Sequence, residues 1–172
     1  MFRSVAVFAA FLLISLTPGA LSAQKMPWQS DSPAGGHSDA SPQSVEYLFP
    51  EQISVPACKD TVVELHFRVK QGMHVNSHQP REKSLIPTQF IAAEDGNVDI
   101  SAVDFPEGSD YVLPSMPNDK LSVYTGEFVL KAHIRARAGD HMLEGALRYQ
   151  ACDDHSCYPP RKAPVAVDVI AR

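Results

Sequence analysis

Hydrophobic and polar side chains alternate along three long segments of the chain. Every second residue is hydrophobic in residues 61–69 (TVVELHFRV), 127–134 (EFVLKAHI) and 163–171 (APVAVDVIA). Successive side chains of a β-strand point to opposite faces, so a period of two predicts strands with one buried face. The positions expected to be buried are Val63, Leu65, Phe67, Val69, Phe128, Leu130, Ala132, Ile134, Val165, Val167 and Val169.

Shorter hydrophobic runs lie between these segments and are separated by Gly, Pro, Asn and Asp residues. They cover residues 72–76, 87–93, 98–105, 121–125 and 141–151. The total of about eight strands, each bounded by turn residues, is typical of a β-sandwich, and no segment sustains the period of 3.6 residues that an amphipathic helix needs. The sequence therefore predicts an all-β fold, an immunoglobulin-like antiparallel β-sandwich, with a closed barrel as the alternative.

The N-terminal part of the chain lacks this alternation. Residues 1–23 begin with a positive charge at Arg3, continue with a short apolar run and end in small residues, which is the order of a signal peptide. Residues 24–44 are rich in Ser, Pro, Gly and Asp, and such a composition cannot bury enough surface to offset chain entropy. We expect a signal peptide (1–23), a disordered linker (24–44) and one domain (45–172), with an uncleaved N-terminal anchor as the alternative.

Charge and hydrophobicity limit the cellular locations and the classes of partner that the sequence predicts. The formal net charge of −5 arises from 20 acidic and 15 basic residues that are interspersed along the chain. No basic tract therefore indicates nucleic-acid binding. No later stretch approaches the 18 or so apolar residues of a membrane span, and we expect none in the mature chain. The predicted location is periplasmic or secreted, where conditions are oxidising and a nearby cysteine pair can close.

Two of the three cysteines lie in residues 148–162 (RYQACDDHSCYPPRK), between two predicted strands. We expect Cys152 and Cys157 to face each other across a turn formed by residues 153–156. Opposed residues of an antiparallel pair have Cα atoms roughly 4.5–5.5 Å apart, within reach of a disulfide. A ring of about six residues stabilises by only roughly 2 kcal/mol in the loop-entropy model. A structural staple and an exchangeable disulfide both remain open on chemistry alone.

The residues next to the two sulfurs differ. Asp153 and Asp154 directly follow Cys152, and their carboxylates oppose formation of a thiolate there. Cys157 follows His155 and has no adjacent acidic residue. We therefore expect Cys157 to be the better nucleophile.

Residues 149–160 (YQACDDHSCYPP) resemble the cysteine motif of the N-terminal periplasmic domain of the thiol:disulfide interchange protein DsbD. In that family a Tyr-Gln-x-Cys is followed within a few residues by Cys-Tyr-Pro-Pro. Weaker similarity extends to residues 69–80 (VKQGMHVNSHQP), 85–90 (LIPTQF) and 121–132 (LSVYTGEFVLKA). The resemblance implies an immunoglobulin-like domain in which two cysteines carry electrons without a cofactor.

The same resemblance implies roles for the two cysteines and for partner proteins. A thioredoxin-like domain would reduce the disulfide, and the dithiol would then reduce disulfide-bearing periplasmic proteins. Cys157 would form the mixed disulfides and Cys152 would resolve them. Because the given sequence ends at Arg172, soon after the region of similarity, we expect the thioredoxin-like donor on a separate polypeptide.

Other family features fall on different residue types here. The loop that covers the cysteine pair in the family corresponds to residues 111–120 (YVLPSMPNDK), where Met116 would shield the sulfurs in place of an aromatic residue. The family's tyrosines on the glycine-containing strand are replaced by His74 and Asn76. The side chains expected to modulate the cysteine pair are Asp153, Asp154, His155, Tyr158, Met116, His74 and Asn76.

Two other functions compete with an exchange reaction. Cys152, His155 and Cys157 are soft and borderline ligands within one turn, and a fourth ligand from His74, His78 or Cys58 would complete a Cu(I) or Zn(II) site. The other alternative is a non-catalytic interaction domain with an inert disulfide.

Cys58 leaves an odd number of cysteines, which in an exported protein indicates a free thiol or a bond between chains. It lies in a predicted turn between Pro56 and Asp60. We expect a partly buried free thiol, with Cys152 bonded to Cys157.

Overall fold

The computed structural model describes residues 43–49, 52–93 and 96–172. The predicted signal peptide (1–23) and residues 24–42 of the predicted linker lie outside the described residues. The described part consists of strands, turns and loops, and it contains no helix long and apolar enough to cross a membrane. The strands are β1 (Val45–Phe49), β2 (Gln52–Val55), β3 (Asp60–Val69), β4 (His74–Asn76), β5 (Gln89–Ala92), β6 (Val98–Asp104), β7 (Ser109–Val112), β8 (Lys120–Tyr124), β9 (Glu127–Ala136), β10 (Gly139–Tyr149), β11 (Ala151–Cys152) and β12 (Arg161–Ala171).

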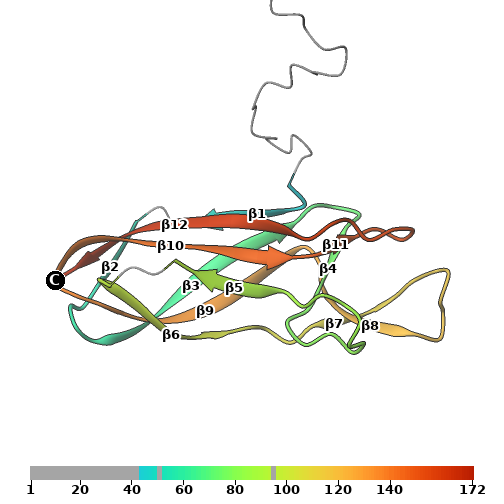
Figure 1. Ribbon diagram of the computed structural model, residues 1–172, viewed down its shortest axis with the longest axis horizontal. Coiled ribbons are helices and arrows are strands. Elements are labelled where there is room, and N and C mark those ends of the chain that lie inside the picture. The colour runs from blue at the N-terminus through green and yellow to red at the C-terminus, as the bar shows by residue number, and fades with distance from the viewer. Residues whose placement is uncertain (1–42, 50–51, 94–95) are drawn as a thin grey trace, which may run out of the picture. The chain divides into compact units, whose positions relative to one another are not determined.

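The strands form three four-stranded sheets, with the orders β1-β3-β9-β6, β2-β12-β10-β5 and β11-β4-β8-β7. All neighbouring strands are antiparallel except β2 and β12, which are parallel. The first two sheets carry the long strands and lie face to face, and the third sheet lies at one end of them (Figure 1). The all-β, immunoglobulin-like sandwich predicted from the sequence is confirmed.

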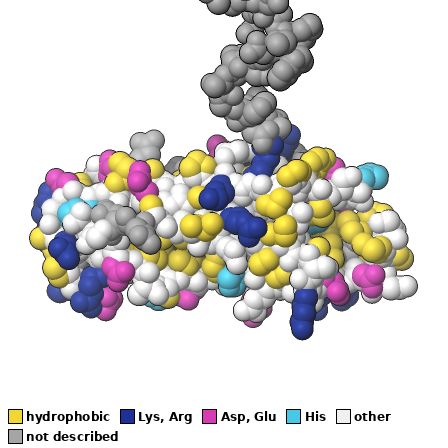
Figure 2. All heavy atoms as spheres, in the orientation of Figure 1, with side chains coloured by type: hydrophobic (Ala, Val, Ile, Leu, Met, Phe, Trp, Pro, Cys, Tyr) yellow, Lys and Arg dark blue, Asp and Glu magenta, His cyan; other side chains and the backbone are white. Residues whose placement is uncertain are grey.

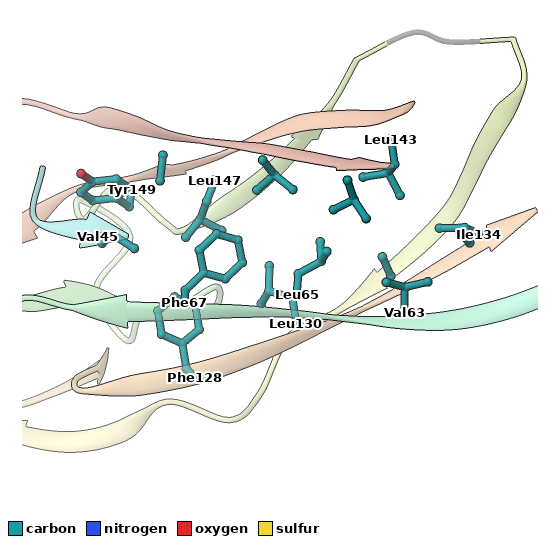
Figure 3. Close-up of a cluster of buried hydrophobic side chains, with 14 of the residues drawn as sticks. Val45, Val63, Leu65, Phe67, Phe128, Leu130, Ile134, Leu143, Leu147 and Tyr149 are labelled. Atoms are coloured by element: carbon teal, nitrogen blue, oxygen red, sulfur yellow. The ribbon is translucent and has the colours of Figure 1, made fainter. Parts of the chain in front are cut away.

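The hydrophobic core fills the space between the first two sheets. Side chains from β3 and β9 point toward side chains from β10 and β12 (Figure 3). The ring of Phe67 lies 5.5 Å from that of Phe128 and 5.4 Å from that of Tyr47, centroid to centroid. Every position that the alternation assigned to the core is buried. The period of two therefore selected the correct face of each long strand.

The third sheet, which we call the end sheet, is built from continuations of the long strands. The chain passes from β10 into β11 after Gln150, and from β8 into β9 through Thr125 and Gly126. Gly126 has a φ of +59°, a backbone conformation that side chains disfavour, and its carbonyl accepts a hydrogen bond from the backbone N–H of Val69. The end sheet is thus fixed to the sandwich by the same strands that form the core.

Three short strands were not predicted, and one predicted strand is divided. β1, β2 and β7 have five, four and four residues, too few for a clear period. The predicted strand 141–151 ends in one sheet at Tyr149 and resumes in another at Ala151. The alternation of buried residues continues across this break, through Leu147, Tyr149 and Ala151, so the pattern does not reveal the change of sheet.

The surface of the sandwich mixes charges of both signs. Basic and acidic side chains are interspersed over the face shown in Figure 2, without a broad region of one sign. Charged side chains of opposite sign pair across strands of the sandwich, such as Arg135 with Asp60 and Arg68 with Glu127. This face has no electrostatic footprint for a nucleic acid.

We predict that Leu130→Ala lowers the free energy of unfolding by about 2–5 kcal/mol, the range for deleting a buried leucine side chain. Leu130 is fully buried and lies opposite Leu65 in the β3–β9 pair. The matched control is Val62→Ala on β3, whose side chain is 51% exposed and whose loss should change stability by less than about 0.5 kcal/mol. Urea unfolding followed by circular dichroism measures both, and equal effects would contradict this placement of the core.

Candidate active site

A disulfide joins Cys152 to Cys157 at the tip of the β10–β12 hairpin. Cys152 lies in β11 and pairs with His74 of β4, whereas Cys157 forms an isolated antiparallel bridge with Cys152. The Cα atoms of the two cysteines are 4.0 Å apart. The cysteines face each other across the turn 153–156, as the sequence predicted.

Asp153 organises the turn between the cysteines. Its Oδ1 atom accepts hydrogen bonds from the backbone N–H groups of His155 (2.8 Å) and Ser156 (2.7 Å), and its Oδ2 atom accepts one from the hydroxyl of Tyr158 (2.6 Å). The Tyr158 hydroxyl and these two N–H groups lower the pKa of Asp153 to about 2, because they stabilise the ionised carboxylate. Asp153 is therefore charged at neutral pH.

Backbone hydrogen bonds close the turn on its other side. The N–H of Asp153 donates to the carbonyl of Ser156 (2.9 Å), and the N–H of Tyr158 donates to the carbonyl of Ala151 (2.8 Å). The Gln150 side chain reaches the carbonyl of Tyr158 through its amide Nε2 (3.3 Å). Tyr158 is thus held by its main chain and by its hydroxyl, although its side chain is 43% exposed.

The two cysteines differ strongly in exposure. Cys152, in strand β11 of the end sheet, is 2% exposed, whereas Cys157 is exposed. His155 and Ser156, which precede Cys157, are exposed as well. An attacking group from another protein therefore has access to Cys157 and not to Cys152.

A cavity of about 260 Å³ adjoins the disulfide. One side is formed by the cysteine turn, and the other by the loop between β7 and β8, through Leu113, Ser115 and Met116. Met116 lines the cavity but is 44% exposed, so it covers the pair incompletely. The predicted covering segment, 111–120, begins in strand β7 and ends in β8, with a loop in between.

His74 lies beneath this cavity. Its side chain is 1% exposed, and Nδ1 has no hydrogen-bond partner among the described residues. Burial lowers the pKa of His74, and the negative charges of Asp154 and Asp153 oppose that effect. The ring centroid of Tyr111 is 4.4 Å from that of His74, and the Tyr111 hydroxyl donates a hydrogen bond to Asp154 (2.6 Å). This hydrogen bond raises the pKa of Tyr111.

Asn76 lines the same cavity two residues further along β4. Its Nδ2 atom donates to the carbonyl of Ile86 (3.0 Å), while Oδ1 is buried with no partner in the described part of the chain. The structure thus brings together, around one cavity, Asn76 and the other predicted modulators that line it: Asp153, Asp154, His155, Met116 and His74. Tyr158 reaches the group through its hydrogen bond to Asp153.

The described residues do not assemble the metal site that the sequence left open. Within them, no three His, Cys, Asp or Glu side chains are grouped so as to hold a metal ion. The sulfurs of Cys152 and Cys157 are bonded to each other, and His78 is turned to another contact, with Nδ1 at 3.0 Å from the carbonyl of Thr88. Cys58 lies in a different pocket with Arg135 and Arg137.

Cys58 is a free thiol, as expected, but the expectation that it is partly buried was wrong. It is exposed in the turn that precedes β3, with a φ of +58°. Its backbone N–H donates to the carbonyl of Ala136 at the end of β9 (2.7 Å). The main chain of the turn is thus held by a strand, and the side chain is directed away from the core.

Sequence reasoning missed the part played by Tyr111 and Gln150. Tyr111 was recognised as the start of the covering segment, but its contacts with His74 and Asp154 join three elements far apart in sequence. The sequence carried no clear signal for these contacts, because Tyr111 lies in β7, whose four residues are too few for a period, and its pairing with β8 is known only from the structure. Gln150 belongs to the cysteine motif itself, and its hydrogen bond to the carbonyl of Tyr158 is known only from the structure.

Solved structures that are similar to this chain include the following two. One is the N-terminal domain of DsbD from Neisseria meningitidis in the reduced form, with 17% identity, a TM-score of 0.39, and coverage of 64% of this chain and 79% of that one. The other is the N-terminal periplasmic domain of ScsB from Proteus mirabilis, with 14% identity and a TM-score of 0.45. That match covers 67% of this chain, which spans 42% of the ScsB chain. No family model matches the sequence, and no curated protein matches it significantly.

We predict that Tyr158→Phe raises the pKa of Asp153 from about 2 toward the ordinary 3.8, because the hydroxyl that lowers this pKa most is lost. The lowered pKa makes Asp153 stabilise the folded state above about pH 4, and this contribution disappears as the pH falls toward 2. Carboxyl ¹³C chemical shifts followed against pH measure the change. Tyr111→Phe is the matched control: it removes the donor to Asp154 and should leave the titration of Asp153 in place.

Proposed function

We propose that this protein is an exported thiol:disulfide interchange domain that passes reducing equivalents from a thioredoxin-like donor to disulfide-bearing proteins of the periplasm. The observation that carries the proposal is the disulfide between a buried cysteine, Cys152, and an exposed one, Cys157. The similarity of the cysteine motif to that of the DsbD N-terminal domain supports the same reaction. The apolar, small-residue pattern of residues 1–23 supports export.

The exposure of the two cysteines sets the order of the chemical steps. A donor thiolate attacks Sγ of Cys157, and Cys152 leaves as a thiolate with the electron pair of the broken S–S bond. The second donor thiolate then attacks the mixed disulfide and releases Cys157. The donor is now a disulfide and the domain a dithiol. In the second half, the Cys157 thiolate attacks the disulfide of a target protein, and Cys152 expels the reduced target while the original disulfide re-forms.

The position of the disulfide gives little support to a structural role. All residues of β10, from Gly139 to Tyr149, already pair with β12 below the cysteine turn. A further link across the open end of that hairpin closes a small ring, and the loop-entropy model gives such a ring only roughly 2 kcal/mol. The exposed sulfur and the adjoining cavity are instead what an exchange reaction requires.

We predict a reduction potential in the range of known exchange proteins, on the order of −120 to −270 mV, for the mature domain. The domain is equilibrated with glutathione or dithiothreitol redox buffers, trapped with an alkylating reagent and quantified by mass. Cys58→Ser removes the exposed third thiol from the count. A value below about −300 mV would identify a structural disulfide and reject the proposed function.

We predict that Cys152→Ser, in a Cys58→Ser background, accumulates a mixed disulfide with a disulfide-bearing target protein, whose S–S bond the Cys157 thiolate attacks. The variant keeps the exposed Cys157 and lacks the thiol that would release the partner. Non-reducing electrophoresis and mass mapping detect the complex. Cys157→Ser is the matched control, and it should trap little because its remaining thiol is buried and lies beside two carboxylates. Equal trapping by both variants would contradict the assigned order of steps.

A further inference from the structure

The resolving step of the proposed function needs a reactive Cys152, and the surroundings of this residue disfavour that reactivity. Resolution requires the thiolate of Cys152, because the thiol is not the nucleophile. Cys152 is 2% exposed and is followed by two carboxylates, of which Asp153 is held ionised by its hydrogen bonds. Burial and neighbouring negative charge both disfavour a thiolate. A group that removes the proton during the attack would overcome this obstacle.

His74 is placed next to Cys152 by the strand register. The two residues lie directly opposite each other in the antiparallel pair of β4 and β11. Side chains of opposed residues emerge on the same face, with Cβ atoms roughly 4.5–5.5 Å apart. Both residues line the cavity of about 260 Å³ beside the disulfide. The imidazole and the sulfur therefore share one face of the end sheet and one cavity.

The state of the His74 ring suits it to accept a proton. Nδ1 is buried and makes no hydrogen bond within the described residues, so no other group occupies this atom. The groups facing the ring are Tyr111 from β7 and the acidic side chains of the cysteine turn, Asp153 and Asp154. Burial outweighs these charges and keeps the imidazole neutral at neutral pH. A buried polar atom without a partner is costly, and its retention needs a reason.

Tyr111 fixes the ring in this position. Its own ring lies 4.4 Å from that of His74, centroid to centroid, and its hydroxyl is bonded to Asp154 of the cysteine turn. His74 is thus held between β7 and the turn that carries the sulfurs. Tyr111 acts through His74 and is a positioning residue.

We propose that His74 is the proton acceptor for Cys152 in the resolving step, an inference that rests on the proposed function. As the Cys152 thiol attacks Sγ of Cys157, its proton passes to the imidazole and a new S–S bond forms between the two cysteines. The bond between Cys157 and the partner breaks, and the partner sulfur leaves with the electron pair. The imidazolium then returns its proton to the departing thiolate or to water. In the opposite direction the imidazolium protonates Cys152 as it leaves.

The experiment uses 5,5′-dithiobis(2-nitrobenzoate) as an artificial partner for the reduced Cys58→Ser protein. A first release of thionitrobenzoate marks attack by Cys157, and a second, independent of reagent concentration, marks resolution by Cys152. Both phases are followed by stopped-flow absorbance across pH 5–9. With His74 present, we expect the rate constant of the second phase to increase with pH at values below the ordinary pKa of a thiol. The midpoint of this increase is set by His74, and the rate constant then levels off.

Substitution of His74 should slow the second phase selectively. In His74→Ala we expect its rate constant at pH 7 to fall by at least about tenfold and to increase with pH as an unassisted thiol does, with the first phase unchanged. Added imidazole should restore part of the lost rate by entering the vacated space. His74→Gln keeps a similar volume without a proton acceptor and should be equally slow but without rescue. His133→Gln, on the distant β9, is the control for loss of a histidine.

The outcomes separate this inference from the proposed function. An unchanged second phase in both His74 variants, with a normal first phase, would overturn the role of His74 and leave the exchange reaction intact. A slower second phase with an unaltered pH profile and no imidazole rescue would assign His74 a structural role and also overturn the inference. Absence of the first phase in the reduced Cys58→Ser protein would instead reject the proposed function.

Discussion

The site depends on the crossing of the chain from one sheet to another at Gln150. Up to Tyr149 the strand belongs to the sandwich and pairs with β12, and from Ala151 it pairs with β4 in the end sheet. The crossing anchors Cys152 in a sheet whose backbone partners are distant in sequence, while Cys157 remains at the tip of the hairpin. Burial of one sulfur and exposure of the other follow from this difference in anchoring.

Hydrogen bonds, and not only proximity in the sequence, determine where the negative charges lie around the sulfurs. Asp153 is directed into its own turn by two backbone N–H groups and a tyrosine hydroxyl, and Asp154 is directed toward Tyr111. Both carboxylates are therefore held in place next to the cysteines by defined partners. The imidazole of His74, which interacts with both carboxylates, is buried and stays neutral because it is removed from water.

The long strands were predictable because each buries one face along its whole length, so β3, β9 and β12 carry a period of two that needs no knowledge of the partner strand. The pairing of Cys152 with Cys157 was predictable for a similar reason, since both flank one local turn. The burial of His74 was not, because β4 has three residues, all buried, and acquires its neighbours from β8 and β11. Contacts such as Tyr111 with Asp154 depend on the register of short strands, which no local pattern determines.

Cys58 precedes the first residue of β3, whereas the cysteine pair lies in the region that follows the other end of that strand. Ten residues of extended chain span roughly 33 Å, so the free thiol has no intramolecular route to the disulfide. Scrambling among the three sulfurs is therefore a reaction between molecules, and its rate scales with protein concentration. The length of the sandwich keeps the thiol of Cys58 apart from the disulfide of the same polypeptide. Both can therefore persist where the concentration of the protein is low.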